Sequence, residues 1–180
     1  RVGDARARGD PERCLSVKLL RIGSTGLGWA PEDLSGAGAA MSPGRWNRVG
    51  ERVVYAAPTL AMAVLETAAH IDDGGLPLNR YVIEIEVPDK VWDARKRVQV
   101  DALPGGWDAI PYGQPSVALG SAWYREGVAA ILELPSVIVP EESIVLINVE
   151  HADSAGMRAS PLRKFQYNAL FRRSELAIRR

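Results

Sequence analysis

Residues 53–66 read Val53-Val54-Tyr55-Ala56-Ala57-Pro58-Thr59-Leu60-Ala61-Met62-Ala63-Val64-Leu65-Glu66. The first part, taken as residues 52–57, predicts a strand. Pro58 suits the first turn of a helix, because proline has no N–H group to lose there. The helix is expected to continue to about Ile71, before the Asp-Asp-Gly-Gly sequence at 72–75. A strand joined directly to a helix keeps the two elements close together, and the rest of the fold is arranged around that pair.

Glu66 is the unusual residue of this run. It is the one carboxylate between Leu60 and Ala69, where the other side chains are Ala, Leu, Met and Val with a single Thr. A charge among apolar side chains is unfavourable unless a partner or a function requires it. Glu66 lies beside the apolar stripe of the helix, and Thr67 fits into that stripe because its hydroxyl can bond a carbonyl one turn back. Glu66 is therefore either a structural partner of an arginine or a functional group.

The remaining periodicity predicts a mixed fold. Residues 80–87 alternate apolar and polar side chains, which is typical of a half-buried strand. Residues 23–44 hold six glycines in 22 positions and predict a long loop of the kind that often carries function. Several short strands with two or three helices favour an α+β fold. The other expected elements are strands at 17–22, 128–134 and 143–149, a helix at 116–126, short elements within 89–115 and a short extended piece at 135–140.

The composition limits the class of protein. The 180 residues suit one domain, and 22 basic against 22 acidic side chains give no overall attraction to nucleic acid, so direct nucleic-acid binding is not expected. The single cysteine, Cys14, has no partner for an internal disulfide, which favours a reducing, cytoplasmic compartment. No apolar run reaches the roughly 20 residues of a membrane span, so no membrane association is expected.

Several familiar kinds of site are absent from the sequence. It has no P-loop, no glycine-rich dinucleotide fingerprint and no His-Glu-x-x-His pair, and its two histidines, His70 and His151, are far apart. Ser136 does not stand in the Gly-x-Ser-x-Gly turn of a serine hydrolase. We therefore expect no metal, and a zinc, Rossmann or serine-hydrolase enzyme is disfavoured.

A set of short motifs stands in order within residues 17–153. They are Arg21 at a strand end, Gly44-Arg45-Trp46-Asn47, Val53-Val54-Tyr55-Ala56, Ala63-Val64-Leu65-Glu66, Pro135-Ser136-Val137-Ile138-Val139-Pro140-Glu141 and Leu146-Ile147-Asn148. Together they resemble the RES-domain family, which is named for an Arg, a Glu and a Ser and consists mostly of toxins of bacterial toxin–antitoxin pairs. One departure is Asn148-Val149-Glu150-His151, where the family pattern would be Asn-Pro-x-His.

The resemblance implies an ADP-ribosyltransferase-like α+β fold with two small packed β-sheets, flanking helices and a cleft for NAD. It implies a single RES-type domain over 1–180, with a core at about 17–153 and a basic C-terminal extension at about 157–180. NAD would be the substrate, and no metal would be needed. The favoured reaction is cleavage of the nicotinamide–ribose bond with water or phosphate as acceptor, and the alternative is transfer of ADP-ribose to a protein. The expected partner is an antitoxin with an Xre-like helix-turn-helix DNA-binding domain.

The resemblance also implies the site residues. Glu66, Arg45 and Ser136 would be catalytic, and the NAD-binding residues would be Arg21, Arg45, Tyr55 and Asn148. The chemistry suits these residue types: a carboxylate stabilises the positive charge that develops on the ribose, and guanidinium groups bind a diphosphate through paired hydrogen bonds. A tyrosine face can stack on the cationic nicotinamide ring. A serine hydroxyl can hold the carboxylate in one rotamer.

Two other interpretations remain open at this point. In the first, the protein is a non-catalytic nucleotide-binding module, and Glu66 is the structural ion-pair partner of Arg45. In the second, the basic residues after Met157 contact nucleic acid through sequence-independent charge attraction. A solvated terminal helix or an antitoxin-docking surface is the simpler interpretation of that basic segment.

Overall fold

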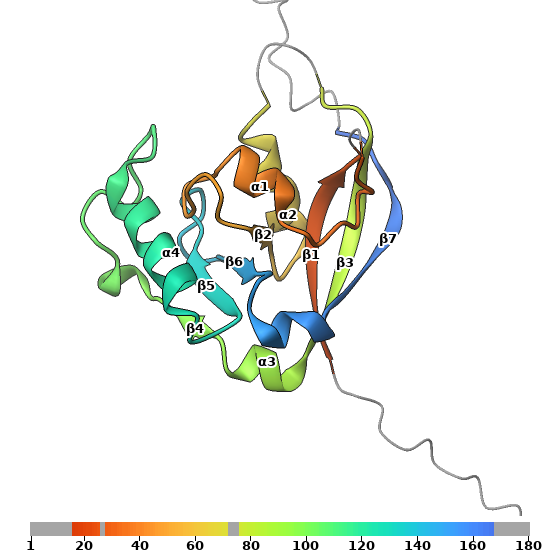
Figure 1. Cartoon of the computed structure of the whole chain (residues 1–180). Coiled ribbons are helices and arrows are strands. Elements are labelled where there is room, and N and C mark those ends of the chain that lie inside the picture. Colours follow the sequence, from red (N-terminus) through yellow and green to blue (C-terminus); the bar gives the residue numbers. More distant parts are fainter. Residues whose placement is uncertain (1–15, 26–27, 72–75, 168–180) are drawn as a thin grey trace, which may run out of the picture.

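The computed structural model of the chain describes residues 16–25, 28–71 and 76–167, and Figure 1 shows how its elements are arranged. The strands are β1 (Ser16–Ser24), β2 (Val53–Ala56), β3 (Arg80–Pro88), β4 (Lys96–Arg97), β5 (Ile131–Pro135), β6 (Ser143–Asn148) and β7 (Arg158–Phe165). The helices are α1 (Ala37–Met41), α2 (Leu60–Ala68), α3 (Asp89–Asp93) and α4 (Gln114–Glu126), with 3₁₀ turns at Val100–Ala102 and Ala152–Gly156.

The strands form two small sheets. The first has the order β1-β3-β7, and both of its strand pairs are antiparallel. The second has the order β2-β6-β5-β4, in which β4 and β5 run parallel and the other pairs are antiparallel. In Figure 1 the first sheet stands on the right, and α4 lies on the left beside the second sheet. The predicted α+β fold with two small sheets and flanking helices is confirmed.

The two sheets pack against each other through buried aliphatic side chains. Ile83 and Ile85 on β3 belong to the same apolar cluster as Val145 and Ile147 on β6. The intervening Glu84 faces away and accepts a hydrogen bond from Lys18 on β1 at 2.8 Å. The alternation predicted for residues 80–87 holds from Ile83 to Val87, whereas Val82 is also buried, next to an irregularity in the pairing with β7. Burial of these apolar side chains stabilises the packed sheets.

The tight connection from β2 to α2 is present as predicted, but the helix begins at Leu60, after the N-cap residue Thr59. The Thr59 hydroxyl accepts a hydrogen bond from the Met62 N–H at 3.2 Å and so satisfies one of the free donors of the first turn. Pro58 therefore precedes the cap instead of occupying the first turn. The helix ends at Ala68 rather than near Ile71.

Thr67 ties α2 to the segment that follows β7. Its hydroxyl lies 2.9 Å from the Ala63 carbonyl oxygen and 3.0 Å from that of Val64, which confirms the predicted back-bonding. The same hydroxyl accepts a hydrogen bond from Tyr167, a buried residue whose ring meets Phe165 edge-on. The helix that carries Glu66 is thus fastened by a residue 100 positions further along the chain.

Three predicted segments differ from the structure. The loop expected at 23–44 contains the end of β1 and the short helix α1, and the strand expected at 128–134 begins at Ile131. Residues 136–140 form a turn rather than an extended piece. The Ser136 N–H donates to the Glu142 carbonyl at 2.9 Å, and the Glu142 N–H donates to the Val139 carbonyl at 2.9 Å. The prolines at both ends thus mark a turn that the hydrogen bonds close.

The beginning of the basic C-terminal segment is a strand of the first sheet. Residues Arg158–Phe165 form β7, which pairs antiparallel with β3, so this part is neither an extension nor a helix. The sheet thus continues past the core boundary predicted near residue 153. Residues 168–180, which carry the remaining basic side chains, lie outside the described residues. Among the helices that the structure does describe, none has the length and apolar character needed to cross a bilayer.

Candidate functional site

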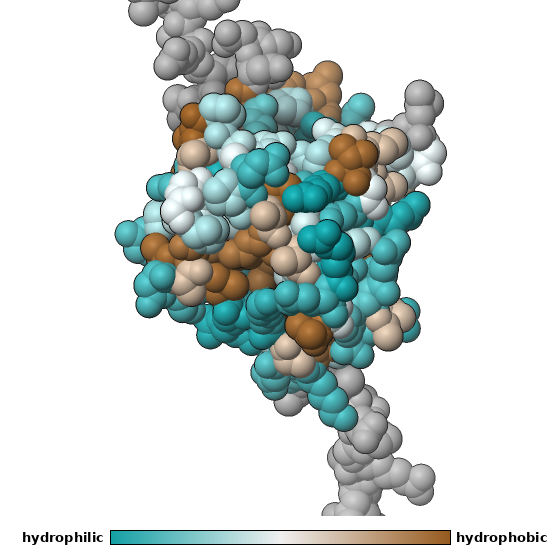
Figure 2. Space-filling model, turned by 60° about the vertical axis from the view of Figure 1, so that its left-hand side comes forward, coloured by the Kyte–Doolittle hydropathy of each residue, from teal (hydrophilic) through white to brown (hydrophobic). Residues whose placement is uncertain are grey.

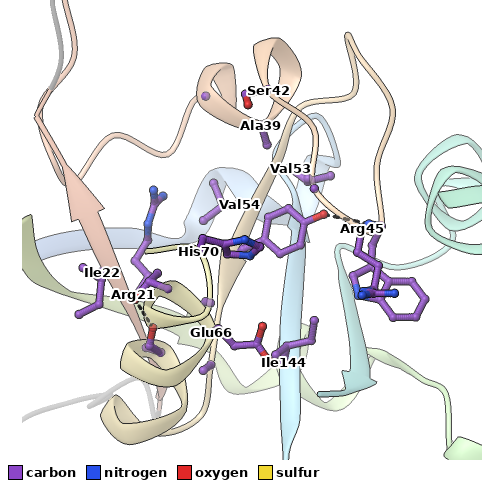
Figure 3. A pocket seen from close by; sticks show the side chains of 18 of the residues that line it. Arg21, Ile22, Ala39, Ser42, Arg45, Val53, Val54, Glu66, His70 and Ile144 are labelled. Carbon is purple, nitrogen blue, oxygen red and sulfur yellow. Dashed lines mark hydrogen bonds between the residues drawn. The ribbon is translucent and has the colours of Figure 1, made fainter. Parts of the chain in front are cut away.

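A cleft of about 780 Å³ opens between β1, β2 and α2. Its wall is completed by the segment around residues 29–46, the segment at 110–112 and the turn after β5. Figure 3 shows Arg21 and Arg45 on opposite sides of this cleft, with His70 and Glu66 between them. Four of the predicted site residues line the cleft: Arg21, Arg45, Tyr55 and Glu66. The fold thus brings together side chains that are spread over 46 positions of the sequence.

Glu66 is held in the cleft by Ser136. The Ser136 hydroxyl donates to Glu66 Oε1 at 2.6 Å, which is the contact predicted from the sequence. The Ser136 oxygen itself accepts hydrogen bonds from the Ile138 N–H at 3.0 Å and the Val139 N–H at 3.2 Å. With both of its acceptor positions used, the hydroxyl can direct its proton only to the carboxylate. The turn at 136–140 therefore has a function: it presents the two N–H groups that orient Ser136.

Glu66 has one oxygen left for a ligand. Within the described residues, Ser136 is the hydrogen-bond partner of its carboxylate, and that bond uses Oε1. No ion pair joins Glu66 to Arg45 in this part of the chain. The structural interpretation in which Arg45 neutralises Glu66 through direct contact is therefore wrong. The half-buried carboxylate is oriented by a neutral hydroxyl and keeps its charge available to the cleft.

Arg45 lines the cleft and also holds the chain at residues 107–109, next to the lining segment 110–112. Its Nη1 donates to the carbonyl oxygens of Trp107 at 2.8 Å and Ala109 at 2.9 Å. A guanidinium has five N–H donors, so three donors on Nε and Nη2 remain for a ligand. Burial lowers the pKa of Arg45, and the negative charge of Glu66 opposes that shift. An arginine still carries its charge at neutral pH, which suits it to an anionic ligand.

Arg21 supplies the second positive charge. It lies on β1, and its Nη1 donates to the Asp33 carbonyl oxygen at 3.4 Å. Burial lowers the pKa of Arg21, and the nearby Asp33 carboxylate raises it. Two guanidinium groups thus enter the cleft from opposite sides, with the Glu66 carboxylate between them (Figure 3).

Tyr55 is locked in place by the motif around residues 44–47. Its hydroxyl accepts a hydrogen bond from the Trp46 N–H at 3.1 Å and donates to Asn47 Oδ1 at 2.9 Å. Asn47 Oδ1 also accepts from the Gly44 N–H at 2.9 Å. A Cβ atom on Gly44 would stand 2.8 Å from the Tyr55 hydroxyl, so a glycine is needed there. Burial raises the pKa of Tyr55, which remains a neutral hydroxyl whose ring faces the cleft.

Asn148 does not belong to this site. Its side-chain amide donates to the Tyr124 carbonyl at 3.2 Å, and its Oδ1 accepts from the Glu150 N–H at 3.1 Å. Both ends of the amide are therefore used to join α4 to the turn after β6, and Asn148 is absent from the cleft lining. The predicted contact of Asn148 with NAD is corrected to a structural role. His151 lies three residues after the end of β6. Its Nδ1 accepts a hydrogen bond from the Asp153 N–H, and it does not line the cleft either.

Sequence reasoning missed two residues of the cleft. His70 follows α2 and lines the cleft, although the sequence analysis gave it no role in the site. Its spacing of four positions from Glu66 was the available signal, because residues i and i+4 share a helix face. Tyr112 also lines the cleft, and its hydroxyl donates to the Pro43 carbonyl at 3.2 Å. No local pattern in residues 89–115 predicts that Tyr112 lines the cleft.

The mouth of the cleft includes exposed apolar side chains. Figure 2 shows apolar patches on an otherwise mostly hydrophilic face of the molecule. The exposed large apolar residues that also line the cleft are Trp29, Ile110, Tyr112 and Ile138. Exposed apolar groups around a polar, charged floor are typical of a site that binds a ligand with both kinds of surface.

Comparison with known proteins extends these observations. The model of the RES domain family matches residues 18–168. The chain is 47% identical over 154 residues to the "Prs ADP-ribosylating toxin" of Sphingobium sp. (strain YBL2), covering 86% of this chain and 96% of the relative. It is 33% identical over 114 residues to "Toxin Res" of Photorhabdus laumondii, covering 63% and 71% of the two chains. It is 37% identical over 121 residues to "Toxin Res" of Pseudomonas putida, covering 66% and 79%.

A solved structure shares the fold. The crystal structure of the M. tuberculosis MbcT–MbcA toxin–antitoxin complex contains a chain that matches with a TM-score of 0.57. The match covers 87% of each chain at 17% sequence identity. At that identity the similarity concerns the arrangement of sheets and helices.

Proposed function

Because the chain belongs to the RES-domain family, we propose that it is the toxin of a bacterial toxin–antitoxin pair and that it consumes NAD. The bond broken is the one between nicotinamide and ribose. One observation carries the proposal: a carboxylate, Glu66, is oriented by the fully buried Ser136 on the floor of a cleft that also presents two arginines. The volume of about 780 Å³ lies within the range of roughly 300–1,000 Å³ typical of small-molecule sites.

Glu66 would act on the ribose. As nicotinamide leaves, positive charge builds on the ribose in an oxocarbenium-like transition state. The oxygen of Glu66 that Ser136 leaves unbonded can stabilise that charge, and it does so more in the transition state than in the ground state. The carboxylate is fixed before the substrate arrives, so little reorganisation is needed during the reaction.

Arg21, Arg45 and Tyr55 would bind the rest of NAD. The free donors of Arg45 and the guanidinium of Arg21 suit the diphosphate, because each can form paired hydrogen bonds with phosphate oxygens. The ring of Tyr55, held through its hydroxyl, offers an aromatic face to the cationic nicotinamide. No metal is needed for this division of roles.

We infer that the acceptor of ADP-ribose is a protein. The support is the name of the Sphingobium relative, an ADP-ribosylating toxin that is 47% identical to this chain over 154 residues. The family resemblance favoured water or phosphate as acceptor, and those two acceptors are the other outcome of the experiment below. All three reactions share the same first requirement, which is cleavage of the nicotinamide–ribose bond at Glu66.

The test is to incubate the full chain with NAD labelled on its adenylate part, in buffer, in phosphate and in a bacterial lysate. Release of nicotinamide together with a labelled protein band supports ADP-ribosylation. Release with soluble labelled products only supports transfer to water or phosphate. Absence of nicotinamide release under all three conditions contradicts the proposed function.

The rival interpretation as a binding module is tested with Glu66→Gln. This change removes the negative charge but keeps an oxygen that can accept the Ser136 hydrogen bond. A binding module should keep its biological effect and its affinity for NAD. An enzyme should lose nicotinamide release by several orders of magnitude, with an unchanged circular dichroism spectrum.

The expected partner is an antitoxin with an Xre-like helix-turn-helix domain, in the same cytoplasmic compartment. The structural relative was solved as a toxin–antitoxin complex, which supports the existence of a partner of that general role. A neighbouring gene for a small helix-turn-helix protein, whose product co-purifies with this chain and suppresses nicotinamide release, would support the proposal. Failure of such a neighbour to bind the chain would contradict it.

A further inference from the structure

His70 stands one helical turn beyond Glu66 and points into the same cleft. Helix α2 ends at Ala68, and the next two residues continue as a turn in which the His70 N–H donates to the Thr67 carbonyl at 3.3 Å. His70 and Glu66 both line the cleft. Figure 3 shows the imidazole between Arg21 and Arg45, near Glu66.

The imidazole of His70 has no protein partner within the described residues. Its recorded hydrogen bond involves the backbone N–H alone, whereas Glu66, Arg45 and Tyr55 each use a side-chain atom to contact the protein. His70 is exposed to the solvent of the cleft. An unpartnered imidazole directed into a ligand cleft is available for proton transfer with whatever enters that cleft.

Glu66 is poorly suited to accept a proton in the proposed reaction. It stabilises the developing positive charge of the ribose only while it remains an anion, and protonation would remove that effect. The reaction still needs a base whenever the acceptor is a hydroxyl, an amine or water, because each of these loses a proton as it bonds to the ribose. The cleft therefore separates two roles that one carboxylate cannot fill at once.

We propose that His70 is the general base that takes the proton from the acceptor, an inference that rests on the proposed function. A lone pair of the acceptor oxygen or nitrogen forms the new bond to the ribose C1′ atom. The bond from C1′ to the nicotinamide nitrogen breaks, and its electron pair stays on that nitrogen, which becomes neutral. The proton of the acceptor passes to a ring nitrogen of His70, and the imidazolium later releases it to water.

This role predicts an acid limb in the rate profile, because a protonated imidazole cannot accept the proton of the acceptor. The other charged or titratable side chains that line the cleft are carboxylates, tyrosines and arginines. Those groups are Arg21, Asp33, Arg45, Tyr55, Glu66 and Tyr112. The His70 variants described below test whether the acid limb depends on this imidazole. The other histidine, His151, lies outside the cleft.

The test compares His70→Ala and His70→Gln with His151→Asn in the full chain. The control variant changes the second histidine, and asparagine can still accept the Asp153 N–H. We expect both His70 variants to release nicotinamide at least about 100-fold more slowly, the loss typical of a missing general base. The KM for NAD should stay within about twofold and the acid limb should disappear. The His151→Asn variant should match the unchanged protein.

Sodium azide separates a base from a structural residue. Azide has no proton to lose, so it needs no base, and adding it should restore nicotinamide release by His70→Ala at least about 10-fold while affecting the unchanged protein little. Three results overturn the inference: near-normal turnover of both His70 variants, a raised KM with unchanged kcat, or no restoration by azide. If the unchanged protein releases no nicotinamide, the proposed function and the inference fall together. Release that His70→Ala retains overturns the inference alone.

Discussion

The Ser136 hydroxyl donates its proton to Glu66 Oε1 across 2.6 Å, although the two residues are 70 positions apart. The contact joins the turn after β5 to α2, and thereby the second sheet to the helix on which the proposed reaction depends. The hydroxyl is itself held by two backbone N–H groups. The geometry of the carboxylate is therefore set by the closure of one turn.

We expect Ser136→Ala to reduce both activity and stability. The change leaves Glu66 without its orienting donor and leaves the N–H groups of Ile138 and Val139 without an acceptor. The free energy of unfolding should fall by about 1–3 kcal/mol, and kcat by at least about 10-fold. Urea unfolding and nicotinamide release measure the two effects.

Ser116→Ala is the matched control for that variant. Ser116 is also fully buried, but its hydroxyl donates to the Gly113 carbonyl and it does not line the cleft. We expect a comparable loss of stability, about 1 kcal/mol, with an unchanged kcat. Equal loss of kcat in the two serine variants would show that Ser136 acts through stability alone.

Arg45→Lys should weaken substrate binding even though the substitution keeps the positive charge. A lysine is a single ammonium group and cannot hold the Trp107 and Ala109 carbonyls while it also binds a diphosphate. We expect the KM for NAD to rise at least about 10-fold. Hydrogen exchange should become faster at residues 107–109, and a variant with raised KM but unchanged exchange there would contradict the shared role.

Tyr55→Phe should affect stability and leave substrate binding largely intact. The ring remains available to stack, but the Trp46 N–H and Asn47 lose their hydroxyl partner. We expect unfolding free energy to fall by about 1–3 kcal/mol and the KM for NAD to change by less than about threefold. Tyr55→Leu removes the aromatic face as well, and its KM should rise further, by roughly 2- to 30-fold.

Gly44→Ala should disturb the same hydrogen bonds of the Tyr55 hydroxyl. The new Cβ atom would lie 2.8 Å from the Tyr55 hydroxyl, so the ring must move away from its hydrogen bonds. We expect a loss of about 1–3 kcal/mol in unfolding free energy, with reduced activity. Gly105→Ala is the control, because a Cβ atom there meets nothing within 4 Å. Similar melting temperatures for the two alanine variants would disprove this explanation.

Much of the site was readable from the sequence because its parts are local motifs. Glu66 stood out as a charge in an apolar run, and Gly44-Arg45-Trp46-Asn47 stood out as a compact motif. The NAD substrate came from the family resemblance, since no local pattern specifies a ligand. The fold class followed from short strands with few helices, which the two sheets confirm.

The errors concern contacts between distant segments. Asn148 shares the family motif, but its amide is used by Tyr124 and Glu150, and only the packing of α4 beside β6 shows this. The segment at 135–140 looked extended from its prolines, whereas hydrogen bonds to Glu142 close it into a turn. Propensity describes what a segment tolerates, and tertiary hydrogen bonds decide which tolerated form it adopts.

The late position of β7 in the sequence determines when the first sheet can be completed during synthesis. Strand β3 is the centre of the first sheet, and its second neighbour, β7, ends at Phe165. Tyr167, which fastens α2 through Thr67, leaves the ribosome later still. A nascent chain that stops before this point has an open edge on β3 and a loosely held Glu66 helix. The residues that line the cleft all precede β7, but translation products that end before β7 lack these supports and should be less stable and less active.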